Sequence, residues 1–175
     1  MYFLLILNGA IRTALPGWEG YFIGGTMACK DQPEIVEELH MEYYRAGADV
    51  ATTNNFAATE FSLSRALGDA SGVQELTRVL PQPLHQPNCT DSHCVEPMRA
   101  QAAVAVAQRA RTAAVAACPR RRLLVAGSLP PLRESYEPLT TQQAGDAGRQ
   151  YAEIAGALAE ADVLLCETMA SVLEV

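Results

Sequence analysis

The sequence predicts an α/β fold built on a parallel β-sheet. Four short apolar runs alternate along the 175 residues with segments of helical periodicity. Each run stops abruptly at a small polar cluster, which is typical of buried parallel strands whose carboxyl ends open onto one shared site. The runs, with their polar clusters, are Leu4–Gly9, Ala48–Phe56, Leu123–Pro131 and Val163–Thr168.

Composition indicates a packed core and excludes several classes of protein. Hydrophobic residues make up 49% and charged residues 19% of the chain, and the formal net charge is −7. Such an acidic chain is a poor candidate for nucleic-acid binding, and the short basic cluster Arg120–Arg122 is expected at a helix end instead. No run approaches the ~20 apolar residues of a membrane span, and Met1–Leu7 lacks the features of a signal peptide. Five irregularly spaced cysteines argue against a disulfide framework and favour the cytoplasm.

The most clearly marked helix is expected to begin at Asp31 as N-cap. Pro33 suits its first turn, and Glu34 stands at the capping-box spacing. Gly47 is expected to end the helix in the left-handed conformation. Its apolar face is expected at four-residue spacing, through Ile35, Leu39 and Tyr43.

The remaining elements continue the alternation. Strands are expected to begin near Phe3, Asp49, Leu123 and Val163. Further helices are expected over about 61–67, 98–117 and 141–161, the last with Tyr151, Ile154 and Leu158 facing inward. This order implies right-handed crossovers between parallel strands. Four strands form either an open sheet or the first half of a larger fold.

Residues 69–97 interrupt this rhythm with four prolines and a group of histidines and cysteines. The potential ligands are His85, Cys89, His93 and Cys94. Their spacing matches no standard zinc pattern, so an irregular insertion is favoured over a small metal knot.

Four segments together resemble the zinc-dependent homocysteine S-methyltransferases, also called the homocysteine-binding domain family. They are Leu7–Leu15, Leu39–Thr59, Val125–Tyr136 and Ala161–Thr168, in the family's order and at its strand ends. The resemblance implies a (β/α)₈ TIM-type barrel, which typically takes about 250 residues. The chain would then be a single truncated domain over 1–175, with about the first four β/α units of that barrel.

The resemblance also implies methyl transfer from a small donor to the thiol of homocysteine, which forms methionine. Because a free thiol has a pKa of about 8.5, the family uses zinc to hold the sulfur as a thiolate. Its zinc ligands come from an Asn-x-Cys segment and a later cysteine pair, neither of which matches a position here. We therefore assign no catalytic residue and no metal ligand, and interpret Cys166 as a core residue of its strand.

Glu167 is the strongest candidate for substrate binding. It follows an apolar strand, where a carboxylate is unfavourable unless it is paired. The family's equivalent glutamate contacts the homocysteine amino group, and the resemblance carries that role to Glu167. The alternative is a glutamate in the first turn of a following helix, stabilised by the helix dipole.

Four further residues are assigned to substrate binding: Asn8, Gly9, Thr53 and Asn54. Asn8 and Gly9 occupy the family's Asp-Gly position, but an amide cannot neutralise an ammonium group, and a plain turn is the alternative. Thr52, Thr53 and Asn54 are expected to donate to the substrate carboxylate or shape the floor of the site. The alternative is that they cap the next helix, and the two roles are compatible. Ser128 is interpreted as part of a rigid lining loop, because no histidine is placed to activate it.

Two other hypotheses stay open. The chain is a non-catalytic fragment or pseudoenzyme that pairs with a second copy or a separate half to complete a barrel, since a half barrel leaves two strand edges open. Or it is an independent α/β domain with an incidental resemblance. Under the methyl-transfer hypothesis, residues 1–175 by themselves are expected to be inactive.

Overall fold

The computed structural model describes residues 4–5, 24–67 and 95–174. Within them, four parallel strands form one sheet in the order β1-β2-β3-β4. The strands are β1 (Leu4–Leu5), β2 (Val50–Thr52), β3 (Leu124–Leu129) and β4 (Val163–Cys166). The α/β class, the parallel sheet and the predicted strand starts are confirmed.

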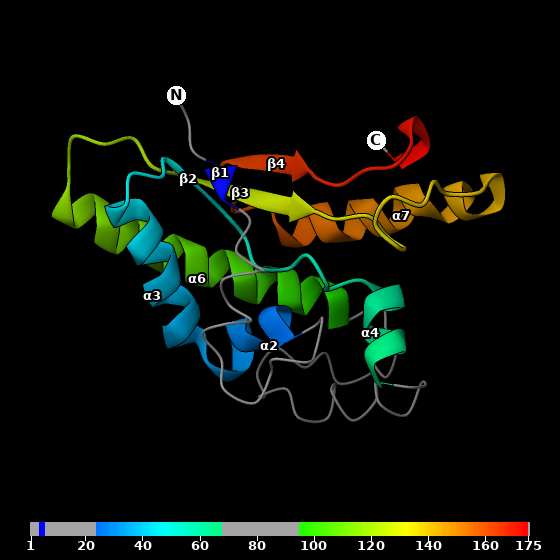
Figure 1. Cartoon of the computed structure of the whole chain (residues 1–175), viewed down its shortest axis with the longest axis horizontal. Coiled ribbons are helices and arrows are strands. Elements are labelled where there is room, and N and C mark those ends of the chain that lie inside the picture. Colours follow the sequence, from blue (N-terminus) through cyan, green and yellow to red (C-terminus); the bar gives the residue numbers. More distant parts are fainter. Residues whose placement is uncertain (1–3, 6–23, 68–94, 175) are drawn as a thin grey trace.

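Helices cover one face of this sheet. Figure 1 shows α3, α6 and α7 on the same side of the strands, and α6 packs against α2, α3, α7 and β3. The helices are α2 (Gly24–Asp31), α3 (Pro33–Arg45), α4 (Glu60–Leu67), α6 (Val95–Ala117) and α7 (Thr141–Ala157), and a 3₁₀ turn, η2, spans Val172–Glu174. Among the described helices, none combines the length and apolarity needed to cross a bilayer.

The start of α3 differs from the prediction. Asp31 is the last residue of α2, and the N-cap of α3 is Gln32, which makes no side-chain capping bond. The predicted apolar face, Ile35, Leu39 and Tyr43, is only half-buried, whereas the fully buried side chains lie one position further on, at Val36, His40 and Tyr44. Packing against α2, α6 and β2 turns this face inward. Gly47 has φ = +109°, as predicted.

Other helix boundaries agree more closely. The helix expected over 98–117 begins earlier, so residues 95–97, assigned to the insertion, belong to α6. The rest of the insertion lies outside the described residues. α7 ends at Ala157 rather than near 161, and Thr140 and Gln143 form a capping box at its start.

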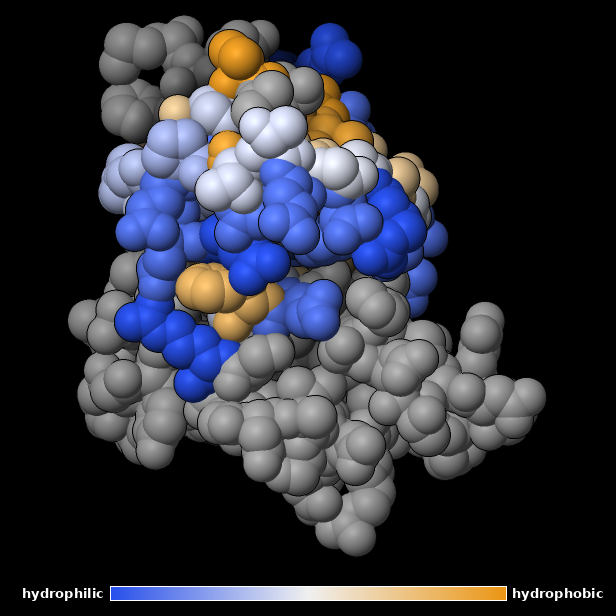
Figure 2. Space-filling model, turned by 90° about the vertical axis from the view of Figure 1, so that its right-hand side faces the viewer, coloured by the Kyte–Doolittle hydropathy of each residue, from blue (hydrophilic) through white to orange (hydrophobic). Residues whose placement is uncertain are grey.

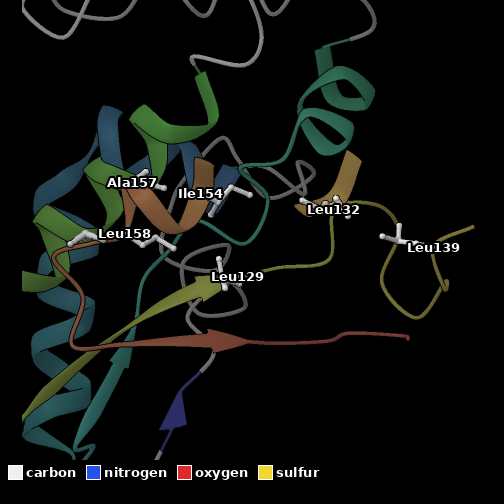
Figure 3. Packing of buried hydrophobic residues seen from close by; sticks show 9 residues of the cluster. Leu129, Leu132, Leu139, Ile154, Ala157 and Leu158 are labelled. Carbon is white, nitrogen blue, oxygen red and sulfur yellow. The ribbon is translucent and has the colours of Figure 1, made fainter. Parts of the chain in front are cut away.

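A hydrophobic cluster fixes α7 against the carboxyl end of β3. Figure 3 shows Leu129 at the tip of β3 beside Ile154 of α7 and Leu158, the residue that follows α7. The contact is close, since a Cβ on Gly127 would lie 3.1 Å from the Cβ of Leu158. This packing holds the end of β3, and with it Ser128, in place.

The fourth strand is not buried, contrary to the prediction for all four apolar runs. Val163 and Leu164 are 48% and 49% exposed, and Cys166 is also exposed rather than a core residue. The physical reason is its position at the end of the strand order, where β3 is its one strand neighbour within the described residues.

Candidate functional site

Polar side chains from three neighbouring strands meet at the carboxyl edge of the sheet. The backbone ladder continues just past the strands, with Thr53 N–H donating to Ala126 O at 2.8 Å and Glu167 N–H to Leu129 O at 3.1 Å. Side-chain hydrogen bonds across this edge then join both Thr53 and Glu167 to Ser128. Figure 2 faces the end of the molecule toward which β3 and β4 point, and the described surface there is mainly hydrophilic.

A closed set of hydrogen bonds joins the residues after β2 to Ser128. Thr53 Oγ1 donates to Asn55 Oδ1 at 2.6 Å and accepts from Ser128 N–H at 2.9 Å. Asn55 Nδ2 donates to Ser128 O at 2.9 Å. All three residues are buried, so these bonds are shielded from water.

Glu167 is connected to this set through Ser128. The Ser128 hydroxyl donates to Glu167 Oε1, while the buried Oε2 has no hydrogen-bond partner among the described residues. Burial raises the pKa of Glu167, and the hydrogen bond from Ser128 opposes that rise. A shielded carboxylate with one open oxygen is suited to bind a cationic group such as an ammonium.

The chain turns sharply directly after Glu167. β4 ends at Cys166, and the next regular element is η2, so Glu167 does not lie in the first turn of a described helix. Thr168 has φ = +60°, which is unusual for a β-branched residue. The helix-start alternative for Glu167 is therefore wrong.

Asn54 points away from Glu167's partners and toward α2. Its Nδ2 lies 3.4 Å from Cys29 Sγ, and both residues are buried. The helix-cap alternative for Thr52, Thr53 and Asn54 is also wrong, because α4 begins only at Glu60, and Thr59 Oγ1 accepts from Ser62 N–H at 3.2 Å.

The sequence prediction missed part of this arrangement. Asn55 was not selected, although it stands in the same polar cluster as Thr53 and Asn54. Cys29 was not connected with the site, because α2 itself was not predicted. Asn8 and Gly9, which were assigned to substrate binding, lie outside the described residues.

The described residues do not fit a zinc site. No group of three or more His, Cys, Asp or Glu side chains within 4–5, 24–67 and 95–174 is arranged to hold a metal ion. Cys29 is buried in α2, whereas Cys118 and Cys166 are exposed at the end of α6 and on β4. The histidines and cysteines of the insertion lie outside the described part of the chain.

Comparison with known proteins decides the family. Residues 5–175 match the family profile described as Homocysteine S-methyltransferase. The chain belongs to the homocysteine S-methyltransferase family. A curated homocysteine S-methyltransferase from Escherichia coli (strain K12) is 36% identical over 59 residues, which are 32% of this chain and 19% of that relative. The resemblance of the four sequence segments is thereby confirmed.

Solved structures of a homocysteine methyltransferase family member, MmuM from Escherichia coli, share the fold. The metallated form gives a TM-score of 0.72 at 24% identity, over 99% of this chain and 56% of that one. The oxidized form gives a TM-score of 0.63 at 26% identity, over 86% of this chain and 47% of that one. The chain thus spans about half the length of these relatives.

Proposed function

We propose that this chain carries the homocysteine-binding part of a homocysteine S-methyltransferase, built as about the first four β/α units of a (β/α)₈ barrel. Membership of the family supports methyl transfer in general. The parallel strands, adjacent in sequence order, are what consecutive units of such a barrel require. The reaction would move a methyl group from a small donor to the homocysteine sulfur and form methionine.

The single observation that carries the proposal is the open oxygen of Glu167. Its Oε2 is buried at the carboxyl edge of the sheet, without a hydrogen-bond partner in the described structure. An α-ammonium group placed there would neutralise the carboxylate and supply the missing donor. The Asn8–Gly9 segment is proposed to line the amino-acid end of the substrate, whereas Thr53 and Asn54, whose side chains hydrogen-bond within the protein, are proposed to shape the floor of the site.

Zinc enters the proposal through the family rather than through these side chains. When bound, zinc would keep the substrate sulfur ionised at neutral pH. Since the described residues do not fit a zinc site, we assign it no ligands. We keep the expectation that residues 1–175 by themselves show no methyl transfer as part of the proposal. The cytoplasmic location expected from the cysteine pattern stays a prediction.

The exposed fourth strand favours a second candidate function, a non-catalytic chain that pairs with another to complete a barrel. Val163 and Leu164 expose apolar surface on β4, which within the described residues has a strand neighbour, β3, on one side only. Sedimentation velocity, combined with a homocysteine titration, distinguishes the two candidates. A chain that self-associates and does not bind homocysteine supports pairing alone. A monomer that binds homocysteine contradicts the pairing function.

Calorimetric titration of the purified chain with L-homocysteine tests the main proposal. We expect saturable binding, weakened tenfold or more in Glu167→Gln, since a charge-assisted hydrogen bond is lost, about 1.4 kcal/mol per factor of ten. Glu160→Gln is the matched control, because Glu160 is exposed after α7 and away from the strand ends. Equal affinity in both variants, or no binding to the parent chain, would overturn the proposal.

A further inference from the structure

We infer that Ser128 is a positioning residue for Glu167, and that Thr53 and Asn55 act through Ser128 rather than by touching the substrate. The inference deepens the proposed function. Only the identity of the ligand that Glu167 binds rests on that function; the positioning role of Ser128 does not. It stands on the hydrogen bonds that surround Ser128 on three sides.

The first step is the way in which the main chain of Ser128 is held. β2 ends at Thr52, so no further backbone of that strand pairs with β3 at Ser128. Side chains take its place: Thr53 Oγ1 accepts from Ser128 N–H, and Asn55 Nδ2 donates to Ser128 O, both at 2.9 Å. Both polar groups of the Ser128 backbone are thereby fixed, in a position that is completely buried.

The second step is an inventory of the hydroxyl hydrogens. The one hydroxyl hydrogen of Thr53 is directed to Asn55 Oδ1 at 2.6 Å, so none remains for a substrate carboxylate. The one hydroxyl hydrogen of Ser128 is directed to Glu167 Oε1. Oε1 is therefore occupied by the protein, and Oε2 is the oxygen left for a ligand.

The third step is the weak support that Glu167 receives from its own strand. β4 has exposed side chains at Val163, Leu164 and Cys166, and β3 is its one strand neighbour in the described structure. The orientation of the Glu167 carboxylate thus depends on β3, through Ser128. Fixing one oxygen in this way presents the other to the ligand at a low entropic cost.

The experiment is a ¹³C NMR titration of the glutamate side-chain carboxyls in the full chain, without substrate. Glu167→Gln identifies the Glu167 signal by its disappearance. We expect Ser128→Ala and Thr53→Val to move the Glu167 midpoint to higher pH, because each removes or loosens the hydrogen bond that favours the charged form. Thr112→Val is the matched control, as it removes a hydroxyl on the exposed face of α6 and leaves the midpoint unchanged.

A conservative variant separates positioning from general damage. Thr53→Ser keeps the hydroxyl and is expected to restore the parent midpoint, even if Thr53→Val loses the fold. A Glu167 midpoint unmoved in folded Ser128→Ala, or moved equally by Thr112→Val, would overturn the inference. Homocysteine affinity, measured on the same samples, is a separate readout: a shifted midpoint without any homocysteine binding would keep the positioning role and refute the proposed ligand.

Discussion

The main-chain N–H of Glu167 donates to the carbonyl oxygen of Leu129 at 3.1 Å, one residue beyond the end of β4. This bond extends the β3–β4 ladder and fixes the start of the Glu167 side chain beside Ser128. The strain that follows it, at Thr168 with φ = +60°, falls where the chain leaves the sheet. A partly buried carboxylate is thus held at the strand ends without a cationic partner among the described residues.

The burial of Glu167 has a consequence for stability. Its folded-state pKa is raised above the ordinary value of 4.5 by burial, so the folded chain binds this proton more tightly than the unfolded chain does. The cost of ionising Glu167 in the folded state is absent below the pKa of the unfolded chain. Stability is lost as the pH rises from that pKa through the higher pKa of the folded chain. Glu167→Gln is therefore expected to unfold at a higher temperature than the parent near neutral pH, with a smaller difference at about pH 4. Thermal unfolding at both pH values is the measurement, and a neutral-pH loss of stability would contradict it.

Burial of His40 is expected to give folding stability the opposite dependence on pH. It is fully buried in α3, neither ring nitrogen has a hydrogen-bond partner among the described residues, and burial lowers its pKa from 6.5 to about 4. Stability is lost as pH falls from 6.5 toward about 4, by up to about 3 kcal/mol, because the unfolded chain takes up the proton first. His40→Leu is expected to flatten this acid limb in denaturant titrations. An acid limb that is unchanged in the variant would show that other groups cause it.

Gly127 is required by the close approach of the segment that follows α7 to β3. A Cβ there would lie 3.1 Å from Leu158 Cβ and 3.2 Å from Ala161 Cβ, atoms that move only with their backbone. Gly127→Ala is expected to cost about 1–3 kcal/mol of unfolding free energy. Gly148→Ala, with open space around the added methyl, is the control and is expected to stabilise α7 by about 0.5–1 kcal/mol. Equal effects of the two substitutions would refute the tight contact.

Arg121 is expected to stabilise the end of α3. Its guanidinium donates to the carbonyl oxygens of Tyr44 and Ala48 and pairs with Asp49 at 3.0 Å. One member of the basic cluster, Arg121, thus lies at a helix end, that of α3, which the sequence did not specify. Arg121→Ala is expected to cost about 1–2 kcal/mol in chemical denaturation. Exposed Arg120, mutated to alanine, is the control and should change stability little.

The sequence predicts features that are set by local residues better than features that are set by residues distant in the chain. Strand starts and the long helices are set by local periodicity, so β3 and α6 lie close to where they were expected. Burial is set by neighbours distant in the chain, and for that reason the buried face of α3 was misplaced by one residue and β4 was wrongly expected to be buried.

The candidate site shows the same division. The polar clusters after β2 and β4 were visible as endings of apolar runs, and Thr53, Asn54 and Glu167 were selected from them. The hydrogen bonds that give each residue its place depend on strand register, which a single sequence does not reveal. Asn55 and Ser128 were therefore overlooked as the residues that connect β2 to Glu167.

The most direct test of the account compares two ligands on the same purified chain: L-homocysteine and its analogue without the α-amino group. If Glu167 Oε2 binds the ammonium, the parent chain will bind homocysteine at least tenfold more tightly than the analogue, and Glu167→Gln will abolish that difference. A preference for homocysteine that survives in Glu167→Gln, or no preference in the parent chain, would contradict the account.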